Sequence, residues 1–220
     1  MKYAALALSA LLAIAYGLFG AGLYESELPH IAPVALKASG VIILGFIALF
    51  ARSRLLAAGL LFGALGDALL AWSPDTFLYG AFAFLIGHLF YIALFLRAGL
   101  GLSALKQPPR LLGALALIAA AIVMISLLVP RENPMFTPLA IYTGVLTSMA
   151  IISLTLPATR WLAMLGAVLF LISDGFVAAN MFHPAADPAV AYWGRFTGWM
   201  IYWAGQAALC FGALGLQRRR

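Results

Sequence analysis

The stretch LLFGALGDALLAW, residues 60–72, is apolar enough to lie inside a lipid bilayer, yet it carries a carboxylate, Asp67, near its middle. An ionisable side chain inside a transmembrane helix costs at least about 2.5–3.5 kcal/mol on insertion scales. Such residues are therefore rare, face the interior of a bundle or a water-filled cavity, and mark functional sites. Asp67 is accordingly the first candidate for a functional residue.

The apolar character of this stretch extends along the whole chain. Of its 220 residues, 65% are hydrophobic and 9% are charged, and the mean hydropathy is +1.05. A soluble domain carries about 25% charged residues, so the sequence predicts an integral membrane protein. The basic residues are scattered singly, which argues against a nucleic-acid partner. The single cysteine, Cys210, excludes an intrachain disulfide and any cysteine-based metal site.

Eight apolar segments are each long enough to form a transmembrane helix, which needs about 20 residues. The connections between them are short and leave nothing for a soluble domain. We therefore expect an all-α fold, in which residues 1–220 form a single polytopic bundle of about eight transmembrane helices. The predicted spans are residues 3–23, 33–50, 55–72, 76–97, 111–130, 135–156, 161–181 and 195–216.

The loop charges predict the orientation of the bundle. If the N-terminus lies in the cytoplasm, ten basic residues fall on the inner side and two on the outer side, as the positive-inside rule requires. Both termini would then be cytoplasmic, and the expected location is the inner (plasma) membrane of a bacterium. The inner bases are Lys2, Arg52, Arg54, Arg97, Lys106, Arg110, Arg160 and Arg218 to Arg220; the outer loops carry Arg131, Arg195, Glu25, Glu27, Asp75, Glu132 and Asp187.

The first segment, MKYAALALSALLAIAYG (residues 1–17), has two interpretations. Its basic start and apolar core are typical of a signal peptide, whose cleavage would leave seven spans. No clean cleavage site followed by a polar stretch comes after it, which favours a retained helix.

Three charged residues lie outside the loops, and helix rise places them at a similar depth. Asp67 and Asp174 lie about 18 Å and about 20 Å from the predicted inner ends of their spans, at 1.5 Å per residue. Lys37 lies about one turn below the outer end of the second span. The sequence therefore predicts one shared polar pocket in the outer half of the membrane, lined by both aspartates and Lys37.

Further polar side chains belong to the same layer or lie just below it. They form pairs on single helix faces or flank Asp174, and small residues before Asp67 would let its helix approach its neighbours. The segments around Asp67 and Asp174, each followed by a polar helix, also suggest a weak parallel 4+4 repeat. The polar residues are His88 and Tyr91 at spacing i, i+3, Tyr202 and Gln206 at i, i+4, and Ser173 and Asn180; the small ones are Gly59, Gly63 and Gly66.

These residues and their order resemble the YhhN family of membrane proteins. The similarity rests on LGDALLAW…FLYGAFAFLIGHLFYIALF and on LGAVLFLISDGFVAANMF…YWAGQAAL, within residues 59–97 and 161–212. Lys37 in VALKASG is similar to the family's lysine, although Ala38 replaces the proline that commonly follows it. The family positions correspond here to Gly66-Asp67, Gly80, Phe84, His88, Tyr91, Ser173-Asp174, Tyr202 and Gln206.

The resemblance implies an eight-helix hydrolase that cleaves the vinyl ether bond of lysoplasmalogens, without a metal or organic cofactor. Its substrate would be a lysophospholipid with an alkenyl chain, taken from among membrane lipids. Two carboxyls in one poorly solvated pocket disfavour double ionisation, so one can act as general acid and the other as base. We expect Asp67 and Asp174 to form this pair, with either one as the acid. Tyr202, His88 and Tyr91 would orient water or stabilise charge, and Arg195 and Lys37 would bind the phosphate.

Two other functions, transport and a non-catalytic scaffold role, are compatible with the same intramembrane charged residues. A proton-coupled transporter also needs intramembrane acids, a lysine and a repeat, but the two halves lack Gly- or Pro-broken helices in matching positions and the inner half is dry. In a non-catalytic scaffold the aspartates would only join helices or pair with Lys37, which could itself extend to the outer interface. The sequence leaves the oligomeric state open. His183 and Asp187, in the HPAADP turn, are two potential ligands without a third and do not predict a metal site.

Overall fold

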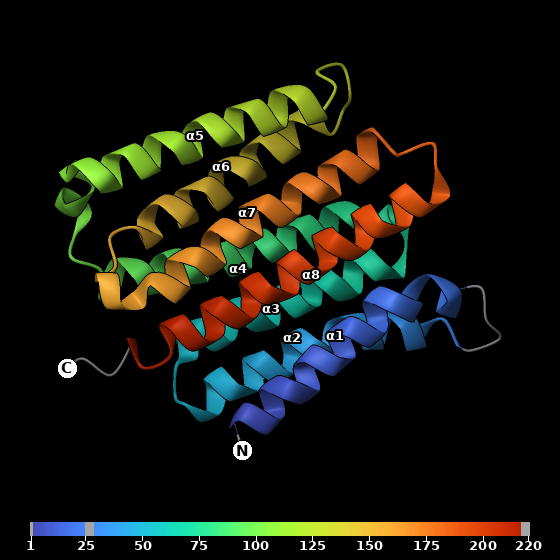
Figure 1. Ribbon diagram of the computed structural model, residues 1–220, viewed down its shortest axis with the longest axis horizontal. Helices are drawn as coiled ribbons and strands as arrows, with labels where there is room; N and C mark the ends of the chain where they lie inside the picture. The colour runs from blue at the N-terminus through green and yellow to red at the C-terminus, as the bar shows by residue number, and fades with distance from the viewer. Residues whose placement is uncertain (1, 25–28, 217–220) are drawn as a thin grey trace.

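The computed structural model describes residues 2–24 and 29–216, and in these residues the chain is entirely helical, without strands (Figure 1). The prediction of an all-α fold is confirmed; Glu25, Glu27 and Arg218 to Arg220, assigned above to loops and the terminus, lie outside the described residues. The helices are α1 (Lys2–Tyr24), α2 (Ile31–Phe50), α3 (Arg54–Trp72), α4 (Phe77–Ala98), α5 (Pro108–Leu128), α6 (Phe136–Ser153), α7 (Trp161–Phe182) and α8 (Pro188–Ala213), with short 3-10 turns η1 (Pro74–Thr76), η2 (Leu102–Lys106) and η3 (Ala158–Arg160).

Helices α1 to α7 are each long and apolar enough to cross a membrane, so the protein is an integral, multi-pass membrane protein. Helix α8 has 26 residues and a more polar sequence that includes Arg195. It lies alongside α7 and runs the length of the bundle (Figure 1). The polar residues of α8 are accommodated because it lies at the centre of the bundle, in contact with α1, α2, α3 and α7.

The eight helices form a central group flanked by two helical hairpins. Helices α3, α4, α7 and α8 are central; α1 and α2 cover α3 and α8, and α5 and α6 cover α4 and α7 (Figure 1). Helix α1 begins and α8 ends at the same end of the bundle, which we call the terminal end. The first helix begins and the last helix ends at the same end of the bundle because successive helices alternate in direction and their number is even.

The start of α8 corrects the sequence prediction. The helix begins at Pro188 rather than at residue 195, so half of the predicted loop is helical. The Asp187 carboxylate accepts hydrogen bonds from the backbone N–H groups of Ala189 (2.7 Å) and Val190 (3.1 Å). An aspartate N-cap followed by proline at the first helical position is a strong helix start. As a result, Arg195 lies within the helix, about two turns after its start.

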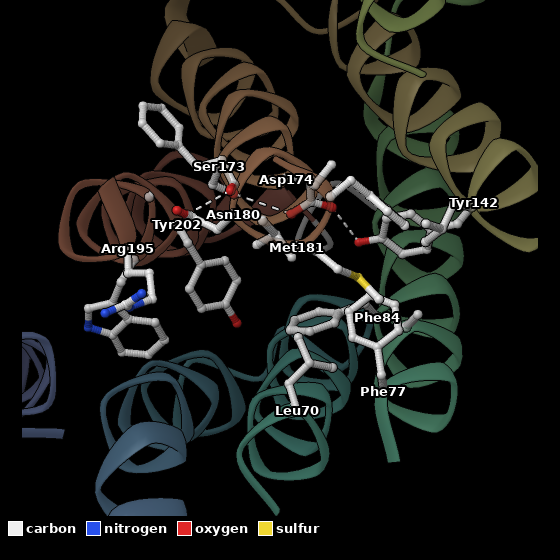
Figure 2. Close-up of a pocket in the computed structure, with 18 of the residues that line it drawn as sticks. Leu70, Phe77, Phe84, Tyr142, Ser173, Asp174, Asn180, Met181, Arg195 and Tyr202 are labelled. Atoms are coloured by element: carbon white, nitrogen blue, oxygen red, sulfur yellow. Dashed lines mark hydrogen bonds between the residues drawn. The ribbon is translucent and has the colours of Figure 1, made fainter. Parts of the chain in front are cut away.

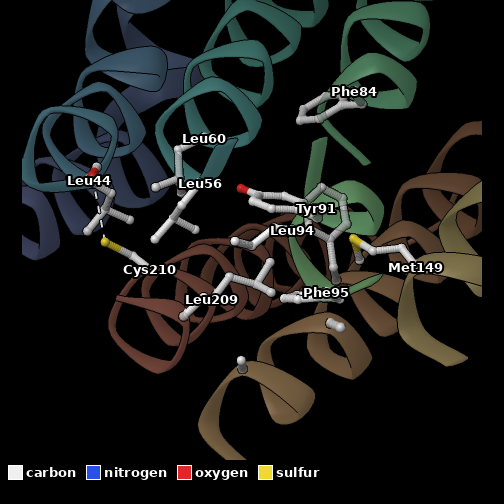
Figure 3. Packing of buried hydrophobic residues seen from close by; sticks show 14 of the residues in the cluster. Leu44, Leu56, Leu60, Phe84, Tyr91, Leu94, Phe95, Met149, Leu209 and Cys210 are labelled. Atoms are coloured by element: carbon white, nitrogen blue, oxygen red, sulfur yellow. Dashed lines mark hydrogen bonds between the residues drawn. The ribbon is translucent and has the colours of Figure 1, made fainter. Parts of the chain in front are cut away.

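The half of the bundle nearer the terminal end is filled by apolar side chains (Figure 3). The largest of these have no more than 1% of their surface exposed, and they come from six different helices. This half therefore forms a closely packed core between the helices. Its members include Leu44, Leu56, Leu60, Leu94, Phe95, Leu146, Met149 and Leu209.

Helices α7 and α8 approach each other through glycines. A Cβ atom at Gly166 would lie 2.6 Å from the backbone nitrogen of Leu209 and 2.7 Å from the carbonyl oxygen of Gly205. Because both neighbours are backbone atoms, the helices themselves would have to separate.

We expect Gly166→Ala to lower the free energy of unfolding by about 1–3 kcal/mol, the usual cost of overpacking. The measurement is the thermal unfolding midpoint of the purified protein in detergent. Gly144→Ala is the matched control, because a Cβ at Gly144 meets nothing within 4 Å. Equal midpoints for the two variants would contradict this account of the α7–α8 contact.

Candidate functional site

A cavity of about 680 Å³ lies in the half of the bundle away from the terminal end (Figure 2). Both intramembrane aspartates, Asp67 and Asp174, line it together with Lys37, so the prediction that these three share one pocket agrees with the geometry. Most of the remaining wall is apolar. The other predicted site residues that line it are Ser173, Asn180, Arg195 and Tyr202, and its apolar wall includes Leu70, Phe77, Phe84, Met124, Ile125, Val129, Leu139, Val177, Met181 and Phe182.

Asp67 is the end of a chain of buried hydrogen bonds. The Tyr91 hydroxyl donates to Gln206 Oε1 (2.8 Å), and Gln206 Nε2 donates to the Tyr202 oxygen (3.1 Å). The Tyr202 hydroxyl then donates to Asp67 Oδ2 at 2.8 Å. The Asp67 side chain is 2% exposed and Gln206 is fully buried. This chain, from α4 through α8 to α3, fixes the direction of the Asp67 carboxyl.

Asp174 is the end of a second chain, which uses different helices. The Tyr142 hydroxyl donates to Asp174 Oδ2 at 2.6 Å, and His88 Nε2 lies 3.1 Å from the same hydroxyl oxygen (Figure 2 shows the Tyr142 bond). His88 and Tyr91 were predicted on one face of α4. Both side chains are buried, but they belong to separate chains, because His88 bonds a residue of α6 whereas Tyr91 bonds a residue of α8.

Aromatic rings lie between the two chains. The Phe170 ring makes edge contacts with His88 (centroids 4.6 Å apart), Tyr202 (5.2 Å) and Phe84 (5.9 Å). Phe84 lines the cavity, whereas Phe170 is buried behind it. The rings therefore separate the cavity from the apolar core and hold the two chains apart.

The glycines of α3 provide the space that this arrangement needs. A Cβ at Gly63 would lie 2.6 Å from Gln206 Nε2, and a Cβ at Gly66 would lie 2.6 Å from the Phe84 ring. Gly59 faces the Tyr91 ring in the same way. The expectation that these glycines permit close approach on the Asp67 side of the helix is confirmed, and each one contacts a specific site residue.

Lys37 lies among aromatic rings of the cavity wall. Its Nζ is 5.6 Å from the centroid of the Tyr16 ring and 5.8 Å from that of Trp199. Trp199 lies 11 residues inside α8, about 16 Å from its start at 1.5 Å per residue, and its indole N–H donates to the Ala13 carbonyl at 2.8 Å. Trp199 is therefore part of the cavity wall, well inside the bundle.

Three of the predicted supporting residues do not line the cavity. His88, Tyr91 and Gln206 are buried behind it and reach the aspartates only through tyrosine hydroxyls. They can position the site, but in this arrangement they do not contact a molecule in the cavity.

Two tyrosines of the cavity wall, Tyr142 and Tyr16, were not predicted. Each is a tyrosine within an apolar span, where tyrosine is as typical of helix packing as of a functional site. Tyr142 lies six residues from the start of α6, and Lys37 lies six residues from the start of α2, so the two have a similar depth. That match in depth was the available signal. Within the described part of the chain, no three His, Cys, Asp or Glu side chains cluster closely enough to hold a metal ion.

Comparison with known proteins gives three curated relatives. Lysoplasmalogenase TMEM86B of Mus musculus is 36% identical over 160 residues, which is 73% of this chain and 63% of the relative. The Rattus norvegicus protein of the same name is 35% identical over 161 residues, covering 73% and 61%. Lysoplasmalogenase TMEM86A of Homo sapiens is 32% identical over 149 residues, covering 63% and 58%. The chain thus spans about three fifths of the length of these relatives, and no solved structure matches it significantly.

The sequence pattern of the YhhN family matches residues 32–213, from the start of α2 to the end of α8. The matched region contains both aspartates, both hydrogen-bonded chains and all the cavity residues except Tyr16. The chain therefore belongs to the YhhN family.

Proposed function

We propose that the protein is a membrane hydrolase that cleaves the vinyl ether bond of lysoplasmalogens, releasing a fatty aldehyde and glycerophospho-ethanolamine or -choline. The observation that carries the proposal is the placement of two carboxyls, Asp67 and Asp174, on one largely apolar cavity inside the bundle. The names of the mouse, rat and human relatives support the same substrate class.

The chemistry requires an acid and a base. Hydrolysis begins when an acid transfers its proton to the second carbon of the alkenyl chain, and the double bond becomes an oxocarbenium ion at the first carbon. Water then attacks the first carbon, and a base removes its proton to give a hemiacetal. The hemiacetal collapses to the aldehyde and the free glycerol hydroxyl. Two carboxyls in one poorly solvated site suit these two roles, because double ionisation is disfavoured there.

The cavity has room and chemistry for a single-chain phospholipid. Its volume lies within the usual range of about 300–1,000 Å³ for ligand pockets. Lys37, Arg195 and Asn180 supply polar groups suited to a phosphate head group, and Arg195 can bind phosphate oxygens in pairs. The apolar wall between α5, α6 and α7 suits the hydrocarbon chain; it is formed by Met124, Ile125, Val129, Leu139, Val177 and Phe182.

The charge distribution of the loops supports a topology in which both termini are cytoplasmic. The cavity would then open towards the outer half of the membrane. A transporter would need a second path through the terminal half of the bundle, where the described residues instead form the closely packed apolar core of Figure 3. This difference favours catalysis over transport.

The direct test is aldehyde release by the purified protein from lysoplasmenyl-ethanolamine. We expect turnover of this alkenyl lipid and none of the matched alkyl-ether lipid, which has no double bond to protonate. In D₂O the freshly trapped aldehyde should carry one deuterium at its second carbon. Absence of aldehyde, together with uptake of a solute into proteoliposomes, would overturn the proposal in favour of transport.

A further inference from the structure

The two aspartates differ in their partners, and the difference bears on which of them carries a proton. Each accepts one tyrosine hydroxyl at Oδ2: Tyr202 for Asp67 and Tyr142 for Asp174. The groups behind each tyrosine, and the cation beside one of the carboxyls, make the two sites different.

Asp67 lines the cavity together with two cations of the described chain, Lys37 from α2 and Arg195 from α8. Lys37 is the cation with which the Asp67 carboxyl interacts electrostatically. In addition, every donor of the chain from Tyr91 points towards Asp67, and the Gln206 amide gives the chain a direction. A neighbouring cation and a chain that ends in an acceptor both stabilise a carboxylate.

Among the described residues, Asp174 has no comparable interaction with a cation. Because Tyr142 has one hydroxyl hydrogen and donates it to Asp174 Oδ2, its oxygen can only accept from His88. His88 must therefore carry its hydrogen on Nε2. Its Nδ1 is buried and, within the described residues, has no hydrogen-bond partner, so the bond to Tyr142 alone determines the tautomer.

The second oxygen of Asp174 has no strong donor. Ser173 donates its single hydroxyl hydrogen to the Phe170 carbonyl at 2.7 Å, which leaves its contact with Asp174 Oδ1 at 3.4 Å. Asp174 Oδ1 is thus free to carry a proton, while Oδ2 is held by Tyr142. His88 also has a cost for stability, because its Nδ1 is unpartnered within the described residues and its side chain is only 1% exposed. A residue kept despite that cost is a candidate for a functional role.

We propose that Asp174 is the acid of the pair and Asp67 its ionised partner, and that Tyr142 and His88 are positioning residues that hold Asp174 through Oδ2. This assignment rests on the proposed hydrolase function. We call the hydrogen bonds from His88 through Tyr142 to Asp174 the relay. The relay keeps Asp174 Oδ1 as the oxygen that donates the proton, and it stabilises the carboxylate that forms when the proton leaves. Hydrogen bonds in such a row strengthen one another, because His88 polarises the Tyr142 hydroxyl towards Asp174.

The proton balance closes over one turnover. Asp174 Oδ1 gives its proton to the second alkenyl carbon, and the electron pair of the double bond forms the new C–H bond. Asp67 takes a proton from the water that attacks the first carbon. In the collapse, Asp67 returns that proton to the departing glycerol oxygen as the C–O bond breaks, and Asp174 regains a proton from the hemiacetal hydroxyl. Both carboxyls end as they began.

The positioning roles are tested with Tyr142→Phe and His88→Leu, assayed for aldehyde release and thermal stability. We expect kcat to fall about 10- to 100-fold in each, with KM within about twofold, and the double variant to be no slower than the slower single variant. His88→Gln should recover most of the activity, because its amide nitrogen can donate as Nε2 does. Tyr192→Phe is the matched control and should behave like the wild type, since its hydroxyl bonds the Leu18 carbonyl away from the cavity.

The acid and base assignment has its own test, in Asp67→Ala and Asp174→Ala. Added formate is ionised at neutral pH, so it should restore activity to Asp67→Ala at least tenfold and leave Asp174→Ala inactive. Rescue of Asp174→Ala alone would reverse the assignment. Wild-type kcat in Tyr142→Phe, or in His88→Leu should Tyr142→Phe fail to fold, would overturn the relay. If the wild type still releases aldehyde, either of these results would leave the proposed hydrolase function in place. If the wild type releases no aldehyde, both the hydrolase function and the assignments made here are overturned.

Discussion

Asp174→Asn is expected to lower kcat for aldehyde release by about 10²- to 10⁴-fold, the usual contribution of a general acid or base. The amide keeps the size of the side chain and an oxygen that can accept the Tyr142 hydrogen bond, which is 2.6 Å long in the native protein. It has no acidic proton to transfer to carbon. The loss should therefore appear in kcat, without a large fall in the thermal unfolding midpoint.

Asp75→Asn is the matched control for this loss. Asp75 lies exposed in the η1 turn between α3 and α4, so the same chemical change there should leave aldehyde release unaltered. Activity near that of the wild type in Asp174→Asn, at equal amounts of folded protein, would exclude Asp174 from the chemistry.

Asp67→Asn is expected to cause a second loss of about 10²- to 10⁴-fold, because a neutral amide cannot take a proton from the attacking water. Its oxygen can still accept the Tyr202 hydrogen bond, so the chain through Gln206 should persist. The measurement is again kcat and KM for the alkenyl lipid, beside the unfolding midpoint.

Lys37→Met separates the two functions proposed around Asp67. If Lys37 mainly stabilises the ionised carboxyl, kcat should fall; if it mainly binds the phosphate, KM should rise. Because Met keeps the apolar stem of Lys, packing against Tyr16 and Trp199 should be retained. Unchanged kcat and KM in this variant would contradict both roles.

The ionisable residues of the site could be predicted because each one is costly. A carboxylate within an apolar span, as at Asp67 or Asp174, or an amine as at Lys37, needs a reason that the bilayer does not supply. Helix rise then gives a common depth, and the structure places all three on one cavity. The catalytic roles assigned to them remain predictions.

The residues that connect the site could not be predicted in the same way. Tyrosine is tolerated in apolar spans, at interfaces and in sites, so Tyr142 gave little signal. Only the packing of α6 against α7 and α4 brings its hydroxyl 2.6 Å from Asp174 and 3.1 Å from His88. The pairing of His88 with one aspartate and Tyr91 with the other likewise depends on which helix each face of α4 meets.

The sequence by itself determined that this is a helical membrane protein with buried charges, because hydropathy, helix length and the cost of an intramembrane ion are local properties of the chain. It also placed the glycines beside Asp67, although their contacts with Gln206 and Phe84 needed the structure. Only the tertiary structure decided the cavity, its aromatic wall and the two separate hydrogen-bonded chains. These depend on distances between helices far apart in sequence, and hydroxyl direction is fixed only when donor and acceptor come within about 3 Å.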